Sequence, residues 1–157
     1  MNERDGREAL RSVIQVLREA GLWAYPLYGQ DGRWIVACDT DAGRVDVRIG
    51  ADGYRVEVWD VSPGLFFDEE DERRRSVKER LVRLTLPRLA ETMRSAPVTL
   101  GEELLSDVWW DHEQHGIGIR LGIEIPFSSE VTLPHLIQEL LHQLDLVRTR
   151  IEERLLE

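Results

Sequence analysis

The sequence contains a single cysteine, Cys38, and a single lysine, Lys78, among its 157 residues. One cysteine excludes an internal disulfide bond and a cysteine-based zinc site. Cys38 ends an apolar run that begins at Trp34, so we expect a small buried core residue there. No apolar run approaches the roughly 18 residues that would cross a membrane, and the charged N-terminus lacks the apolar stretch of a secretory signal. These absences predict a cytoplasmic protein with no membrane partner.

Basic side chains are also scarce, because 20 Lys+Arg stand against 30 Asp+Glu and give a formal net charge of -10. Residues 101–157 contain 4 basic and 12 acidic side chains, and therefore 8 of the 10 excess negative charges. An acidic surface repels a phosphate backbone, so we expect no nucleic-acid partner. The acidic run at residues 68–72 precedes three arginines and is interpreted as the charged start of a helix rather than as a metal site.

Sequence signatures of catalysis are absent as well. The chain has no Gly-x-Ser-x-Gly motif for a nucleophilic serine, and residues 29–32 lack the Lys-Ser/Thr of a phosphate-binding loop. Two groups of histidines invite a test for metal binding. His112 and His115 flank a predicted turn, and Glu139 lies between His135 and His142 on the polar face of a predicted helix. Neither group has the inward-facing ligands of a metal centre, so we predict no catalytic residue, no metal and no cofactor.

The periodicity of apolar residues predicts an α+β fold in a single domain over residues 1–157, a length that supports a core without disulfides. The expected order is a helix, an antiparallel β-meander, a second helix, a β-hairpin and a long C-terminal helix. The corresponding ranges are residues 5–20, 22–61, about 73–94, 107–125 and 133–155. Three turns containing Gly32, Gly43 and Gly53 divide the meander into four strands.

The second helix has apolar residues on too wide an arc for one sheet to cover. Val77, Leu81 and Leu84 form one group, and a second group is offset by more than a quarter turn, although Pro87 should kink the helix and blur this phase. We therefore predict a homodimer in which the second group forms the interface: Val82, Leu86, Leu89 and Met93.

Tryptophan is frequent, with five residues in the chain. Trp109 and Trp110 are adjacent on a predicted strand, so their side chains must lie on opposite faces of the sheet. Trp59 falls on the polar face of the fourth meander strand. We predict that Trp59, Trp109 and Trp110 contribute to a partner-binding surface, with burial beneath loops such as residues 65–67 as the open alternative.

The order of elements resembles the type III secretion chaperone-like fold, and in particular its YbjN-like branch of bacterial sensory transduction regulators. Residues 119–126 (IRLGIEIP) followed by residues 132–141 (TLPHLIQELL) contribute to this resemblance. It implies an α/β sandwich, a homodimer, and a small acidic cytosolic protein without enzymatic activity that holds an extended client on apolar patches. The apparent fourth meander strand and the many tryptophans depart from the family pattern.

The leading hypothesis is a non-enzymatic module that binds a protein or peptide by strand addition or in an apolar groove. The alternative is a small-molecule sensor or an enzyme with a pocket between the sheet and the helices, in which His112, His115 and nearby carboxylates are the polar groups. A third hypothesis, an acidic regulator that mimics a polyanion, depends on the charge of residues 101–157.

Overall fold

A computed structural model describes residues 3–29, 31–63, 73–74, 76–77, 80, 84, 105–114 and 116–156. The chain forms two compact units. The first comprises Met1–Val58 and Gly122–His142, and the second comprises Trp59–Leu121 and Gln143–Glu157. A single domain over the whole chain stays a prediction.

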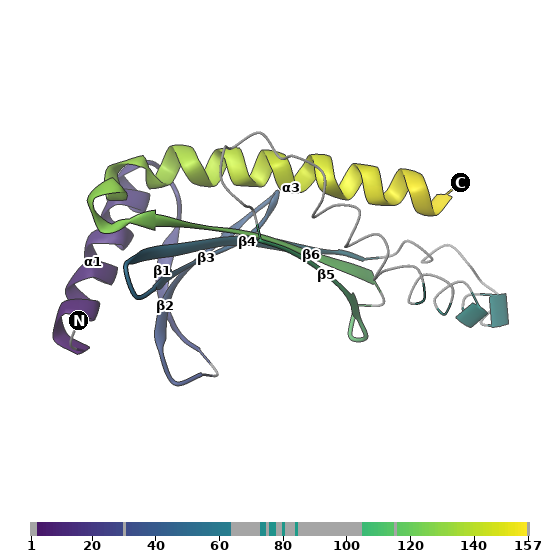
Figure 1. Ribbon diagram of the computed structural model, residues 1–157, viewed down its shortest axis with the longest axis horizontal. Coiled ribbons are helices and arrows are strands. Elements are labelled where there is room, and N and C mark those ends of the chain that lie inside the picture. Colours follow the sequence, from purple (N-terminus) through teal and green to yellow (C-terminus); the bar gives the residue numbers. More distant parts are fainter. Residues whose placement is uncertain are drawn as a thin grey trace. The chain divides into compact units, whose positions relative to one another are not determined.

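The described elements follow the predicted order (Figure 1). They are α1 (Glu3–Glu19), β1 (Ala24–Tyr28), β2 (Trp34–Thr40), β3 (Gly43–Ile49), β4 (Gly53–Pro63), β5 (Leu105–Asp111), β6 (Gly116–Pro126), the 3-10 helix η1 (Phe127–Thr132) and α3 (Leu133–Leu156). The six strands form one antiparallel sheet in the order β1-β2-β3-β4-β6-β5. The α+β prediction is therefore confirmed, and β4, β6 and α3 each contribute residues to both units.

In the first unit, the strand register places one set of buried residues from β1, β2 and β3 on the same face. Cys38 pairs with Ala24 on one side and with Val45 on the other, and Val36 pairs with Val47. All of these side chains are buried, which confirms Cys38 as a core residue. The alternation of side chains along each strand leaves the polar residues of β3 on the opposite face.

Helix α1 covers β1 and β2 in this unit. Its buried residues Leu10, Val13 and Leu17 lie three to four positions apart and so occupy one side of the helix. The helix ends at Glu19, and Gly21 just beyond it has a φ of 86°, in the left-handed region that glycine adopts without steric cost. The N–H of Leu22 donates to the carbonyl of Leu17, which confirms the predicted glycine stop.

Glu130 of η1 joins three elements of the first unit. Its carboxylate accepts hydrogen bonds from the hydroxyl of Ser12 in α1 and, at 2.6 Å, from the hydroxyl of Tyr54 in β4. The ring of Tyr54 also contacts Phe127 edge to face. Burial, followed by the bond to Glu130, raises the pKa of Tyr54 well above its ordinary value. In the part of α3 that belongs to this unit, the apolar stripe is buried at Leu133, Ile137 and Leu140.

In the second unit, the buried residues of β6 and α3 again follow the predicted patterns. Ile117, Ile119 and Leu121 alternate along β6, and Leu144 and Val147 continue the stripe of α3. Arg148 of α3 forms an ion pair with Asp60 of β4, which ties the helix to the sheet. Within the described residues, no helix has the length and apolar character needed to cross a membrane.

The predicted second helix is described only in part. Arg73, Arg74, Ser76, Val77, Arg80 and Leu84 are helical and exposed. The predicted dimer interface lies outside the described residues: Val82, Leu86, Leu89 and Met93. Val77 is 59% exposed and Leu84 71%, so these two members of the first apolar group are largely open to solvent.

Candidate functional site

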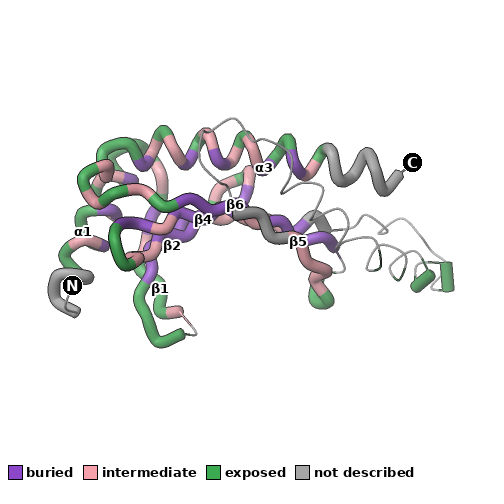
Figure 2. Tube along the Cα trace, in the orientation of Figure 1, coloured by how far each residue is buried: buried purple, intermediate pink, exposed green. Residues whose placement is uncertain are grey.

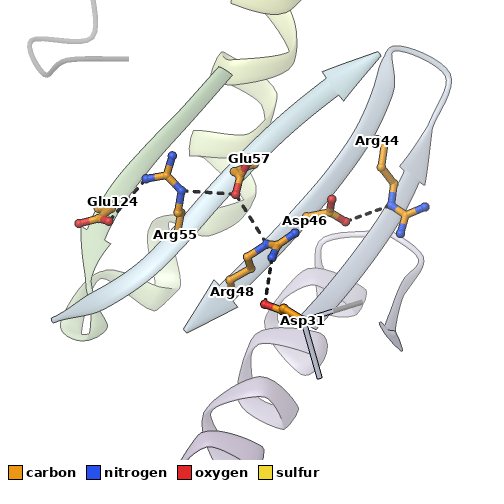
Figure 3. Close-up of polar contacts among 7 residues, drawn as sticks. All are labelled: Asp31, Arg44, Asp46, Arg48, Arg55, Glu57 and Glu124. Carbon is orange, nitrogen blue, oxygen red and sulfur yellow. Dashed lines mark hydrogen bonds and ion pairs between the residues drawn. The ribbon is translucent and has the colours of Figure 1, made fainter. Parts of the chain in front are cut away.

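Charged side chains form a network over one face of the sheet in the first unit (Figure 3). Arg48 of β3 pairs at 3.6 Å with both Asp31 in the β1–β2 turn and Glu57 of β4. Arg55 of β4 pairs with Glu57 at 3.3 Å and with Glu124 of β6 at 3.5 Å. Arginines and carboxylates therefore alternate along a series of ion pairs that runs from the β1–β2 turn across β3 and β4 to β6.

Two carboxylates of this network are nearly inaccessible to solvent. Asp46 is 7% exposed and pairs with Arg44 at 3.2 Å, and Glu57 is 8% exposed between its two arginines. A buried carboxylate needs such partners, because removing one leaves a charge in a poorly solvated position. This arrangement favours a structural role for the network in fixing strand register over a role in proton transfer.

The predicted tryptophans lie in the second unit, where two of them surround an arginine. The guanidinium carbon of Arg120 lies 5.3 Å from the ring centre of Trp109 and 6.0 Å from that of Trp59. The two indole rings are 6.5 Å apart and tilted by 54°. Trp109 therefore shares a face of the sheet with Trp59, and alternation places Trp110 on the other face, as predicted. All three side chains are half-buried.

Gly118 makes room for this cluster. A Cβ atom at position 118 would lie 2.0 Å from Cε2 of Trp109, so only glycine lets the indole pack this closely against β6. The cluster is thus built by close packing of residues from three strands, β4, β5 and β6. Trp and Arg are the residue types that dominate protein interfaces, which suits the predicted partner-binding role of Trp59 and Trp109.

The described histidines lie on the surface. His112, His135 and His142 are exposed, and His115 lies outside the described residues. His135 approaches Glu139 at 3.9 Å, as residues one helical turn apart do. Across the parts of the chain that the structure describes, no three His, Cys, Asp or Glu residues are grouped to hold a metal ion. Burial also raises the pKa of the Cys38 thiol, which disfavours the reactive thiolate.

Among the described residues, the most exposed aromatic side chains lie on and beside the β1–β2 hairpin, which the sequence did not predict to be a binding surface. Much of this hairpin is exposed (Figure 2). Tyr28 is 59% exposed and Trp34 46%, and their rings touch edge to face at 5.0 Å. Trp23, just before β1, is 71% exposed and lies 5.1 Å from the guanidinium of Arg18. The signal that could have revealed them is their position: all three flank turns rather than strand centres.

The hydrogen-bonding pattern between β1 and β2 shows which backbone groups of β1 face away from β2. The N–H of Gly29 donates to the carbonyl of Arg33 at 2.8 Å, which closes the hairpin with a hydrogen-bonded pair. In an antiparallel ladder such pairs alternate, so Leu27 and Tyr25 bond to β2. Pro26, which lacks an N–H, therefore faces away from β2.

At the start of β1, both backbone groups of Ala24 already form hydrogen bonds. The N–H of Ala24 donates to the carbonyl of Leu22 at 3.0 Å, and the carbonyl of Ala24 accepts from Nε of Arg18 at 2.9 Å. With Pro26 at the centre, the outer edge of β1 offers little to an additional strand.

No family model and no curated protein matches the chain. The crystal structure of an uncharacterized protein from Methanothermobacter thermautotrophicus is similar, with a TM-score of 0.53 and 17% sequence identity. The alignment covers 94% of this chain and 99% of the other. At this identity the likeness shows a shared fold alone.

Proposed function

We propose that this protein is a non-enzymatic module that binds a protein or peptide partner. The observation that supports this function is the exposure of Trp23, Tyr28 and Trp34 on and beside the β1–β2 hairpin. Large aromatic side chains cost free energy when they face water, and a protein partner that covers them recovers it. Aromatic residues are also enriched at protein interfaces relative to the rest of the surface.

The chemistry of the described residues supports binding over catalysis. The buried carboxylates Asp46 and Glu57 are paired with arginines, and the Cys38 thiol is buried in the core. Proton transfer and nucleophilic attack need accessible groups. The interpretation as a sensor or an enzyme gains no specific support from His112, which is exposed at the β5–β6 turn.

We further propose that the module works as a homodimer in the cytoplasm. The apolar residues at positions 82, 86, 89 and 93 support the dimer through their sequence pattern. The single cysteine supports a location in a reducing compartment, because small secreted domains commonly contain several disulfide bonds.

Affinity capture tests the binding function. The wild-type chain and a double variant, Tyr28→Ser with Trp34→Ser, are immobilised and exposed to host lysate, and the retained proteins are identified by mass spectrometry. We expect a protein that the wild type retains and the variant loses, and binding of that purified protein should show the same difference. A second double variant, His135→Ala with His142→Ala, is the control, because these side chains are exposed and outside the hairpin. Equal retention by all three chains would refute the role of the hairpin.

A further inference from the structure

The two edges of the sheet differ in what they offer to another chain. β1 and β5 are the first and last strands of the sheet order. The outer edge of β1 lacks a donor at Pro26, and the backbone N–H and C=O of Ala24 already bond to Leu22 and Arg18. β5 contains no proline over Leu105–Asp111, so each of its residues keeps a backbone N–H.

Alternate residues of an antiparallel edge strand direct their N–H and C=O groups away from the sheet. Among the described residues no strand lies beyond β5 in the sheet order. We propose that the outer edge of β5 binds an extended, basic segment of a partner protein by strand addition. This inference rests on the protein-binding function proposed above and names the chemistry of the partner.

The charge around β5 selects a basic segment. Residues 105–114, which the structure describes as β5 and the start of the following turn, contain three acidic residues and no lysine or arginine. At the end of the strand, Asp111 accepts hydrogen bonds from the N–H groups of Glu113 and Gln114 at 3.0 and 2.9 Å. These bonds hold the Asp111 carboxylate at the β5–β6 turn, where the strand ends, and Glu113 is exposed in the same turn. Arginine or lysine in the added strand would pair with these carboxylates.

The same charges disfavour a second copy of this chain as the occupant. An antiparallel pairing of two β5 strands centred on Trp109 sets Asp107 of each copy opposite Asp111 of the other. Like charges directly opposite each other destabilise a strand pair. The dimer predicted from the second helix therefore uses a different surface.

Trp109 and Trp110 favour apolar residues at the centre of the added strand, because these residues would lie beside the indole rings. Trp109 is held between Gly118, Arg120 and Trp59, so it presents a rigid aromatic surface on one face of β5. Trp110 lies on the other face and is half-buried. Cross-strand pairs of aromatic and β-branched side chains are favourable, so valine, isoleucine or threonine suits the positions opposite them.

The test uses the full chain and three fluorescein-labelled peptides of the same length as β5. The first has a centre rich in valine and threonine with arginines at both ends. The second carries glutamates in place of the arginines, and the third has prolines at alternate central positions of the first. Fluorescence anisotropy measures binding of each. We expect the basic peptide to bind about ten-fold or more tightly than the acidic one, with affinity falling as salt rises, and the proline peptide not to bind.

Amide hydrogen exchange then locates the bound peptide. Binding of the basic peptide should slow exchange at alternate amides of β5 and leave β1 unchanged. Glu113→Gln should weaken binding, whereas Pro26→Val, which restores a donor on β1, should not change it. Protection in β1, equal affinity for the basic and acidic peptides, or no binding of the basic peptide would each overturn the proposal.

The two proposals can fail separately. If no basic peptide binds but lysate capture still depends on Tyr28 and Trp34, the strand-addition inference is wrong and the binding function stands. If the basic peptide binds at β5 while lysate capture is the same for all chains, the hairpin is not the binding surface and the edge inference stands.

Discussion

The indole of Trp109 occupies the space that Gly118 leaves by having no side chain, since a Cβ atom there would lie 2.0 Å from Cε2 of the ring. An aromatic residue over a glycine on the neighbouring strand covers exposed backbone and rigidifies the pair. Arg120, two residues further along β6, lies beside the same ring. The Trp59–Trp109 cluster therefore depends on Gly118 and Arg120, which alternate onto the same face of β6.

Gly118→Ala should destabilise the protein by about 1–3 kcal/mol, because the new methyl group overpacks the indole. Denaturant unfolding measures this change. Gly122→Ala is the matched control, because the nearest atom to a Cβ there is Nη2 of Arg55 at 3.2 Å, the end of a flexible side chain. In a Trp109→Ala background, Gly118→Ala should have little further cost. Equal costs for the two glycine variants would contradict the close packing.

The stability of the protein should fall in alkaline solution through Tyr54. Burial and the bond to Glu130 raise the pKa of Tyr54 in the folded state above its ordinary value of 10.0. The unfolded chain therefore loses the phenolic proton first, and its ionisation favours unfolding as the pH rises above 10.0. Below that pH the contribution of Tyr54 is fully present.

Comparison with Tyr54→Phe isolates this contribution. The free energy of unfolding of the wild type should fall relative to that of the variant by about 1.4 kcal/mol for each pH unit above the ordinary tyrosine pKa. Denaturant unfolding between pH 8 and a pH of about 11 provides the measurement. Parallel pH profiles would show that Tyr54 ionises equally in both states.

Leu140→Ala should cost about 2–5 kcal/mol, because the side chain is fully buried on the apolar stripe of α3. His142→Ala, two positions further on the exposed side of the helix, should cost less than about 0.5 kcal/mol. Thermal or denaturant unfolding of both variants checks the pair. Similar costs would mean that the stripe does not face the core.

Light scattering at micromolar concentration should give a mass of about twice 18.2 kDa if the predicted homodimer forms. Leu89→Glu and Met93→Glu should return the mass to that of one chain, because a charge at the centre of an apolar interface is costly to desolvate. Wild-type protein that remains monomeric at high concentration would contradict the prediction that the second apolar group of that helix forms a dimer interface.

The sequence by itself was sufficient to predict the class of fold and most boundaries. The alternation of Ile117, Ile119, Leu121 and Ile123 predicted a strand with one buried face, and all four side chains are buried. The helical spacing of Leu133, Ile137, Leu140 and Leu144 predicted the C-terminal helix in the same way. These predictions hold because burial on one face imposes a period that local sequence must match.

The tertiary structure decided what lies on the faces and edges. Because Trp109 and Trp110 are neighbours in the sequence of a strand, their side chains were predicted to lie on opposite faces of the sheet. Only the packing of the strands brings Trp109 against Gly118 and Trp59. The order of the sheet makes β1 an edge strand and turns Pro26 into a barrier to strand addition. The hairpin leaves Tyr28 and Trp34 exposed at its turn. Each of these outcomes depends on which strands become neighbours, and long-range pairing leaves no periodic trace in the local sequence.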